Sequence, residues 1–434
     1  MILGVTRVEA AVMGAVMGAV SPAVVVPRMV KLMEEGYGTK KGIPQMILAG
    51  ASCDDIFVIV LFSTFAGMAQ ALGATPVQMQ QTLSAYLFGF AFMNLFHGAL
   101  ADSFGRRPVI LWGLMAFTLA SLGCALAQNV TQLIVFRAMQ GLSCGAGVVV
   151  SRAIVRDIFP PTQAQKVMSQ ITIFFGLAPA IAPIMGGWLF VSLGWHSIFW
   201  LLTAIGLALW AVNFKMLPES LHASQRQPFS IPHLMRGYWQ LCTDPRFLLL
   251  ALASGIPFNG MFLYVLSAPA FLGELLQLQP TQFFWLFVLN IGGIMGGAWA
   301  SGRLAGKMVP KKQVRHGLLI MLVISLINLT ANLLFPAHAL WAMLPIAIYS
   351  FGWALMVPVV TLQLLDLFPE RRGMASSLQA VVGSTANGLV AGLVAPLVMH
   401  SAIALATASL GLMLVGLVSW MVLHQRWPDI GREN

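Results

Sequence analysis

Long apolar runs, separated by short polar segments, dominate this chain. From Met46 onward twelve such runs follow one another, and a further run, Val8–Val30, precedes them. Each is long enough for a helix to cross a bilayer, which takes about 20 residues, whereas a transmembrane β-strand needs only about 10. The pattern predicts an all-α polytopic membrane protein of twelve spans plus one extra N-terminal hydrophobic segment. The twelve predicted spans are Met46–Met68, Gln81–Leu100, Pro108–Ala127, Thr131–Ile154, Gln163–Val191, Trp195–Leu217, Phe247–Leu272, Gln282–Leu304, Val314–Phe335, Leu340–Leu367, Gly373–Val398 and Ala402–Leu423.

A polar stretch rich in proline divides the spans into two groups of six. The groups share an internal repeat, because Asp157-Ile-Phe-Pro returns as Asp366-Leu-Phe-Pro and Gly98-Ala-Leu-Ala returns as Gly297-Ala-Trp-Ala. Two related halves around a central site are a transporter architecture. The predicted organisation is an N-terminal segment with a basic linker at 1–45, a six-helix half at 46–217, a linker at 218–246, a second six-helix half at 247–424 and a tail at 425–434.

Composition and charge support a membrane location. Hydrophobic residues make up 58% of the chain and charged residues 9%, against about a quarter charged in soluble proteins. The net charge of +10 does not indicate nucleic-acid binding, because the basic residues fall in alternate connections, as the positive-inside rule requires. The rule predicts a cytoplasmic C-terminus and linker. The basic residues assigned to these connections include Arg106, Arg107, Arg152, Arg156, Lys166, Lys215, Arg226, Arg236, Arg246, Arg371 and Arg372.

The sequence contains no motif that indicates an enzyme or a metal-binding protein. The four cysteines, Cys53, Cys124, Cys144 and Cys242, have neither metal-ligand spacing nor the pattern of a disulfide framework. No nucleophile elbow, Walker loop or zinc spacing occurs. We therefore expect neither an enzyme, nor a metal site, nor a cofactor.

A short connection between the second and third of the twelve spans carries a charged motif. It reads Gly98-Ala-Leu-Ala-Asp102-Ser-Phe-Gly105-Arg106-Arg107-Pro. Gly98 permits close helix packing, and Asp102 can accept from N–H groups at the start of the next helix or pair with a cation there. The pattern G-x-x-x-D-x-x-G-R-R resembles the loop signature of the major facilitator superfamily of secondary transporters.

Arg137 lies within a predicted span, where a charge costs roughly 2.5–3.5 kcal/mol and therefore needs a polar cavity or a partner. Either it lowers the pKa of a nearby carboxylate, or it snorkels and satisfies a helix end. The segment Arg137-Ala-Met-Gln140-Gly141 resembles the R-x-x-Q-G signature of proton-driven facilitator antiporters. That resemblance implies a proton-relay role for Arg137.

The next span combines proline and glycine pairs, which kink a membrane helix and allow close packing. The stretch from Gly176 to Gly187 resembles the antiporter motif G-x-x-x-G-P-x-x-G-G, with Ala182 where the motif has glycine. The matching residues are Gly176, Pro179, Pro183, Gly186 and Gly187.

From about residue 68 onward the likeness extends to a subfamily. It is carried by Leu95-Phe-His-Gly, Ser103-Phe-Gly-Arg-Arg-Pro, Phe174-Phe-Gly-Leu-Ala-Pro-Ala-Ile-Ala-Pro and Asp366-Leu-Phe-Pro-Glu-Arg-Arg-Gly. These stretches resemble the bicyclomycin/chloramphenicol-resistance (Bcr/CflA) exporters over more than four fifths of the chain. The resemblance implies export of small amphipathic drug-like compounds across a bacterial inner membrane, driven by the proton gradient. We expect the protein to act as a monomer in the lipid bilayer.

Residues 1–67 follow a different pattern. Ser21-Pro-Ala-Val-Val-Val-Pro and the pair Asp54-Asp55 resemble two helices of a monovalent cation/proton antiporter. A gene fusion and an assembly artefact both account for this arrangement. We hypothesise that Met46–Met68 replaces the first facilitator helix and brings Asp54 or Asp55 near Arg137 as a proton carrier. Two rivals remain open: a cation/proton exchanger, and an inactive chimeric transporter that lacks its native first helix.

Polar and aromatic residues inside the spans are candidates for a substrate cavity, which needs apolar surface with a few hydrogen-bonding groups. The candidates are Tyr86, Asn94, Gln140, Asn259, Tyr264 and Gln363.

Overall fold

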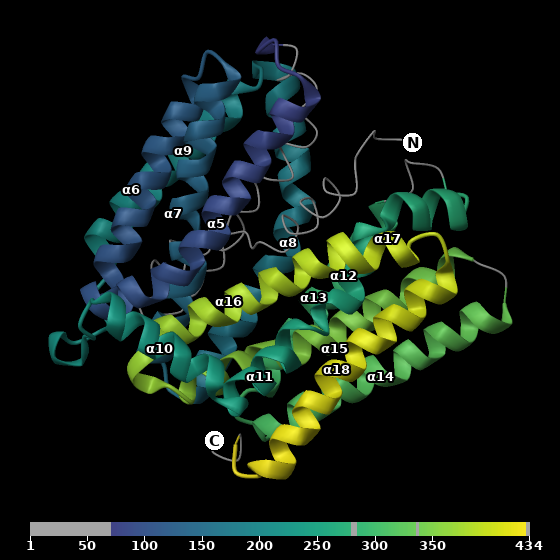
Figure 1. Cartoon of the computed structure of the whole chain (residues 1–434). Coiled ribbons are helices and arrows are strands. Elements are labelled where there is room, and N and C mark those ends of the chain that lie inside the picture. Colours follow the sequence, from purple (N-terminus) through teal and green to yellow (C-terminus); the bar gives the residue numbers. More distant parts are fainter. Residues whose placement is uncertain (1–70, 279–283, 336–337, 431–434) are drawn as a thin grey trace.

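The computed structural model describes residues 71–278, 284–335 and 338–430, and within these ranges all regular secondary structure is helical (Figure 1). The predicted segments Val8–Val30 and Met46–Met68 lie outside the described residues, and so do Asp54 and Asp55.

The N-terminal bundle contains five long helices. Their starts follow from local sequence: Thr75 forms a capping box with Gln78, and the Asn129 side chain accepts from the N–H of Gln132. Gly105 separates the first two helices with φ 103°, a conformation that favours glycine. The helices are α5 (Pro76–Phe104), α6 (Arg106–Ala125), α7 (Val130–Ile158), α8 (Pro161–Leu193) and α9 (His196–Met216).

The linker continues from α9 across one end of the molecule. It contains the short η2 (Ala223–Gln225) and the amphipathic α10 (Ile231–Thr243). The Tyr238 hydroxyl of α10 donates to the carbonyl of Leu95 on α5. Burial raises the pKa of the Tyr238 phenol further above neutral. Its hydrogen bond holds the linker against the first bundle.

The C-terminal bundle contains the remaining helices, several of which are broken by short π or 3₁₀ turns. They are α11 (Pro245–Gly255), α12 (Phe258–Leu266), η3 (Pro269–Leu275), α13 (Phe284–Leu304), α14 (Pro310–Leu334), α15 (Ala339–Asp366), η5 (Pro369–Arg371), α16 (Arg372–Leu389), η6 (Val390–Val394), α17 (Ala395–Val398) and α18 (Ala402–Arg426).

Within the described ranges, nine helical segments are long and apolar enough to cross a membrane. Two further long helices, α8 with 33 residues and α13 with 21, occupy predicted spans as well. The predicted first span of the twelve, Met46–Met68, falls outside these ranges.

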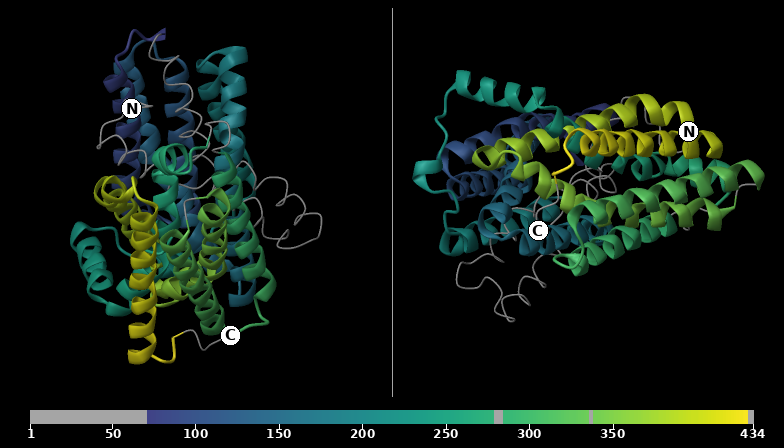
Figure 2. Two further views of the ribbon diagram at one scale, coloured as in Figure 1. Left: turned by 90° about the vertical axis from the view of Figure 1, so that its right-hand side faces the viewer. Right: turned by 90° about the horizontal axis from the view of Figure 1, so that it is seen from below.

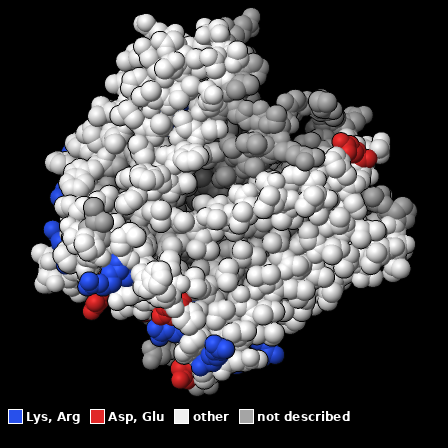
Figure 3. Space-filling model, viewed as in Figure 1, with Lys and Arg blue, Asp and Glu red and all other residues white. Residues whose placement is uncertain are grey.

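Large apolar side chains on the outside of the bundles agree with a lipid environment. Trp188, Leu397 and Phe88 are among the exposed hydrophobic residues. Figure 3 shows Lys and Arg along the left and lower edges of the face in view, whereas the surface above is almost entirely uncharged apart from one acidic group at the upper right. We call the side with the Lys and Arg residues the charged end and define it by Asp102, Arg106, Asp157, Asp366 and Arg372.

The two bundles meet along two helix pairs. In Figures 1 and 2 the bundles lie at an angle to each other, with α5 against α16 and α8 against α13. The internal repeat relates these pairs, because the Gly98 stretch lies on α5 and its echo, the Gly297 stretch, lies on α13. The second helix of each pair follows a repeated Asp-x-Phe-Pro stretch: α16 packs against α5, and α8 packs against α13.

A buried amide network connects α8 with α13. The Gln165 side-chain amide donates to the carbonyl of Ser301 at 3.0 Å and to Oε1 of Gln313 at 2.9 Å. The Gln313 amide in turn donates to Ser301 Oγ at 2.7 Å and to the carbonyl of Leu355 at 2.8 Å. The network joins the two halves without formal charge.

We expect Gln313→Leu to lower the free energy of unfolding by about 1–3 kcal/mol, because it leaves buried groups of Gln165 and Ser301 without a partner. Thermal denaturation of the purified protein in detergent would measure the change. Gln163→Leu, at an exposed position on α8, is the matched control. Equal denaturation midpoints for the two variants would contradict a stabilising role for the network.

Candidate functional site

Two glycines bring the halves into backbone contact at the charged end. A Cβ added at Gly98 on α5 would lie 1.8 Å from the carbonyl oxygen of Gly373 on α16. The N–H of Gly98 donates to Ser377 Oγ at 2.9 Å. The predicted close packing at Gly98 is therefore present, and its partner is a helix 275 positions further along the chain.

Asp102 lies one turn after Gly98 and is fully buried. Its carboxylate accepts from the backbone N–H of Gly373 at 3.0 Å and of Met374 at 2.8 Å, and Arg106 donates to the same carboxylate. The carboxylate thus caps the N-terminal turn of α16, where unpaired N–H groups and the helix dipole favour a negative charge.

This finding corrects part of the sequence-based expectation. Asp102 pairs with a cation at the start of the next helix, Arg106, as predicted, but the N–H groups that it accepts from belong to the opposite half. The N–H groups at the start of α6 are capped instead by Glu219 from the linker, which accepts from Arg106 at 2.8 Å and from Arg107 at 3.3 Å. Arg107 also donates to the carbonyl of Phe214.

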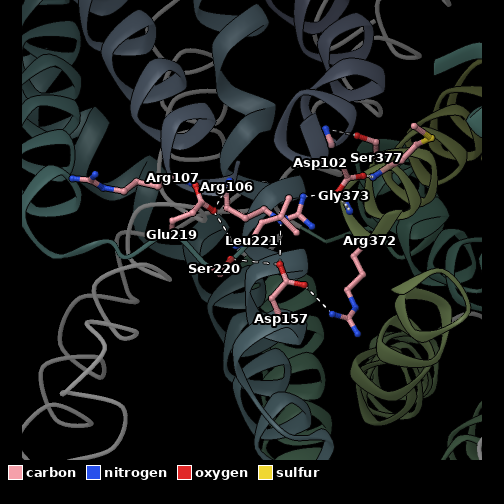
Figure 4. A network of polar contacts seen from close by, with 12 residues as sticks. Asp102, Arg106, Arg107, Asp157, Glu219, Ser220, Leu221, Arg372, Gly373 and Ser377 are labelled. Carbon is pink, nitrogen blue, oxygen red and sulfur yellow. Dashed lines mark hydrogen bonds and ion pairs between the residues drawn. The ribbon is translucent and has the colours of Figure 1, made fainter. Parts of the chain in front are cut away.

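A chain of ion pairs continues from Asp102 across the interface between the halves (Figure 4). Arg106 Nε lies 3.1 Å from Asp157 Oδ2, and Arg372 Nη1 lies 2.9 Å from Asp157 Oδ1. Arg106 is 1% exposed, so these charges interact with little screening by water. Asp157 therefore links α6 and α7 of one half to α16 of the other.

The repeated Asp-x-Phe-Pro stretches supply a reciprocal pair of contacts. Asp157 of the first half accepts from Arg372 of the second, and Asp366 of the second half pairs with Arg156 of the first at 2.5 Å. The repeat was recognised from the sequence only as a sign of duplication. Its aspartates also hold the two halves together at the charged end.

Arg137 occupies a separate buried cluster inside the N-terminal bundle. Its guanidinium lies 4.3 Å from the centroid of the Tyr86 ring and donates to Gln140 Oε1 at 2.8 Å. The Gln140 amide donates to Ser121 Oγ at 2.7 Å. The side chain is fully buried, so its charge is stabilised by the aromatic face and by amide oxygen rather than by water.

A cavity of about 160 Å³ lies between the two halves. It is lined from the N-terminal bundle by Phe90 and Asn94 of α5, Val148 and Arg152 of α7 and Thr172 of α8. The C-terminal bundle contributes Ser254, Phe258, Trp353, Gln379 and Asn387. We call it the central cavity. Arg152, which the sequence pattern assigned to a connection, therefore lies on the cavity wall within α7.

The six predicted cavity residues do not form one site. Asn94 lines the central cavity. Tyr86 and Gln140 surround Arg137, and Asn259 is buried in α12 with its amide directed to the carbonyl of Gly255. Tyr264 accepts from Asn328 within the C-terminal bundle, and Gln363 lines a second cavity at the charged end.

The antiporter motif lies on α8. A Cβ at Gly176 would lie 3.0 Å from Cγ2 of Ile294 on α13, which places this glycine at the interface between the halves. Pro179, Pro183, Gly186 and Gly187 lie further along the same helix.

Comparison with known proteins decides the family. A profile described as Major Facilitator Superfamily matches residues 47–392. The chain belongs to this superfamily. The match begins within the predicted span Met46–Met68, so the superfamily region includes that segment. Members are transporters, and the expectation of a non-enzymatic membrane protein is confirmed.

Two curated relatives of this superfamily member carry resistance in their names. The "Bicyclomycin resistance protein homolog" of Haemophilus influenzae is 30% identical over 346 residues, which cover 78% of this chain and 85% of that protein. "Multidrug resistance protein D" of Escherichia coli is 27% identical over 400 residues, which cover 89% of this chain and 96% of that protein. The predicted likeness to Bcr/CflA-type exporters is confirmed.

Solved structures support the fold. The proton:xylose symporter XylE aligns with a TM-score of 0.63 at 12% identity, over 97% of this chain and 94% of that one. The human organic anion transporter MFSD10 aligns with a TM-score of 0.59 at 20% identity, over 96% of this chain and 99% of that one.

Proposed function

We propose that this transporter exports drug-like amphipathic molecules across the bacterial inner membrane in exchange for protons. The observation that carries the proposal is the central cavity between two halves that are held together at the charged end. The resistance names of its relatives support drug-like substrates. In this proposal the charged end faces the cytoplasm, because its basic residues follow the positive-inside rule.

The contacts at the charged end act as a gate in this mechanism. We call them the charged-end gate and define it by Gly98, Asp102, Asp157, Asp366 and Gly373. Alternating access requires the halves to separate at one end while they close at the other. The contacts of the gate are made in the structure. In this proposal they close the cavity toward the cytoplasm.

Proton coupling is assigned to the buried Arg137 cluster. A fixed positive charge lowers the pKa of a carboxylate nearby and thus favours proton release. The sequence offers Asp54 and Asp55 as that carboxylate. In the proposal, one of them carries the proton, and Tyr86 and Gln140 hold Arg137 in position.

We expect Arg137→Lys to reduce proton-driven efflux about tenfold, because the point charge of lysine cannot keep both the stacking on Tyr86 and the Gln140 geometry. The measurement is efflux rate against the imposed pH gradient in everted vesicles. Tyr86→Phe, which keeps the aromatic ring, is the control and should retain coupling. A full rate and unchanged gradient dependence in Arg137→Lys would contradict this role.

Resistance in living cells tests the function itself. Expression in an efflux-deficient bacterial host should raise the minimum inhibitory concentration of several amphipathic drugs, and a protonophore should abolish cellular drug efflux. Sodium- or potassium-dependent proton flux without drug efflux would instead identify a cation/proton exchanger. A correctly inserted protein with neither activity would refute transport by this chain.

A further inference from the structure

Arg152 gives the central cavity an unusual charge. Among the described residues that line the cavity, it is the one side chain with a formal charge. It projects from α7 one turn before Arg156, so it lies at the cavity wall nearest the charged end. A charge in this position is costly unless a counter-charge or water compensates it.

The acidic residues of the described part of the chain lie outside the cavity wall, and several of them pair with other groups. Asp102, Asp157 and Asp366 pair with Arg106, Arg156 and Arg372 in the charged-end gate. Glu274 lies beside His400 at an exposed position, and Glu219 caps α6. None of them lines the cavity, and no ion pair to Arg152 occurs among the described residues.

The rest of the wall fits an amphipathic molecule. Phe258 and Trp353 lie with ring centroids 5.0 Å apart and, with Phe90, provide aromatic surface. Gln379 donates to Ser254 and Thr361, while its own carbonyl oxygen and those of Asn94 and Asn387 are buried without a partner in the described part of the chain. A ligand with N–H or O–H groups would satisfy such acceptors.

We propose that the central cavity favours small amphipathic molecules with one anionic group, a carboxylate or a sulfonate, and that Arg152 is their counter-charge. The planar guanidinium can donate two parallel hydrogen bonds to such a group. These bonds fix the orientation of the anion in addition to attracting its charge. At about 160 Å³ the cavity is small beside the roughly 300–1,000 Å³ of typical ligand sites, which favours compact aromatic acids in this state. The inference rests on the proposed transport function and adds a substrate class to it.

Three probes with one ring system separate charge from shape. They are 2-naphthoate, 2-naphthamide and 2-naphthylmethylammonium, with charges of −1, 0 and +1. Dissociation constants for the purified full chain in detergent, measured by equilibrium dialysis, should be lowest for naphthoate. In Arg152→Gln the affinity for naphthoate should fall at least tenfold and that for naphthamide less than twofold. Arg152→Lys should retain part of the preference.

Lys166→Gln is the matched control, because it removes the same charge from an exposed position on α8, and it should leave all three constants unchanged. The proposal is overturned if the ammonium probe binds the unaltered chain as tightly as naphthoate, if Arg152→Gln weakens all three probes alike, or if none of them binds. Drug resistance that persists in Arg152→Gln, with no loss of acidic compounds from the panel, would refute the anion preference while leaving the transport function standing.

Discussion

Asp102→Asn should open the charged-end gate and reduce efflux more than tenfold. The site around this carboxylate presents donors alone: the N–H groups of Gly373 and Met374, and the guanidinium of Arg106. An asparagine has one acceptor oxygen and an NH₂ group that donates. Its NH₂ group would therefore point at one of the donors that now bind the carboxylate. Breaking a buried ion pair on one side costs about 3–5 kcal/mol. That energy corresponds to a shift of roughly 100- to 4,000-fold in the balance between closed and open gates.

Labelling from the charged-end side measures the shift directly. A cysteine at Ala380, on the wall of the central cavity, should react slowly with a membrane-impermeant maleimide when the gate is intact and rapidly in Asp102→Asn. Glu370→Gln is the control. It removes a negative charge from an exposed residue just before α16 and should leave the labelling rate unchanged. Identical labelling rates for Asp102→Asn and the unaltered gate would show that this carboxylate does not hold the halves together.

Gly98→Ala should disrupt the same gate by steric means. The added Cβ would lie 1.8 Å from the Gly373 carbonyl oxygen and 2.6 Å from Ser377 Oγ, and a backbone atom cannot rotate away as a side chain can. The helices α5 and α16 must therefore separate, which lengthens the hydrogen bonds from α16 to Asp102 one turn further on. With an overpacking cost of about 3 kcal/mol, we expect efflux to fall roughly a hundredfold.

Gly388→Ala is the matched control for this experiment. Gly388 also lies on α16, but a Cβ there would meet no atom within 4 Å. The control should keep full efflux and gain slightly in helix stability, since alanine is the better helix former. Equal efflux in Gly98→Ala and Gly388→Ala would refute the need for close approach at Gly98.

The sequence predicted the helical architecture because membrane spans are local features. A run of about 20 apolar residues is sufficient to identify each span, and the charged motif at Gly98 can be recognised without knowledge of its partner. The duplication that relates Asp157 to Asp366 was also visible. These features depend on neighbouring residues or on a repeat, so no tertiary information was required.

The contacts of the site depend on pairs that are distant in sequence, and the sequence predicted them poorly. Asp102 lies 271 positions from Gly373, and nothing near either residue indicates the other. The predicted span Thr131–Ile154 contains Arg152, but this residue was counted with the basic residues of the adjoining connection because such residues normally mark a span end. In the structure α7 continues to Ile158, and Arg152 lies on the cavity wall. The dispersal of the six cavity candidates has the same cause: polarity inside a span indicates burial but not which cavity the residue faces.

One cross-link tests directly whether the halves must part at the charged end during transport. A Cβ at position 302 would lie 3.4 Å from the Cβ of Ser169, close to the separation of about 3.5–4.5 Å found in disulfides. The double variant Ser169→Cys/Gly302→Cys should lose proton-driven drug efflux in vesicles on oxidation and regain it on reduction, while each single variant stays active throughout. Full efflux from a protein whose α8 and α13 are quantitatively cross-linked would contradict the mechanism.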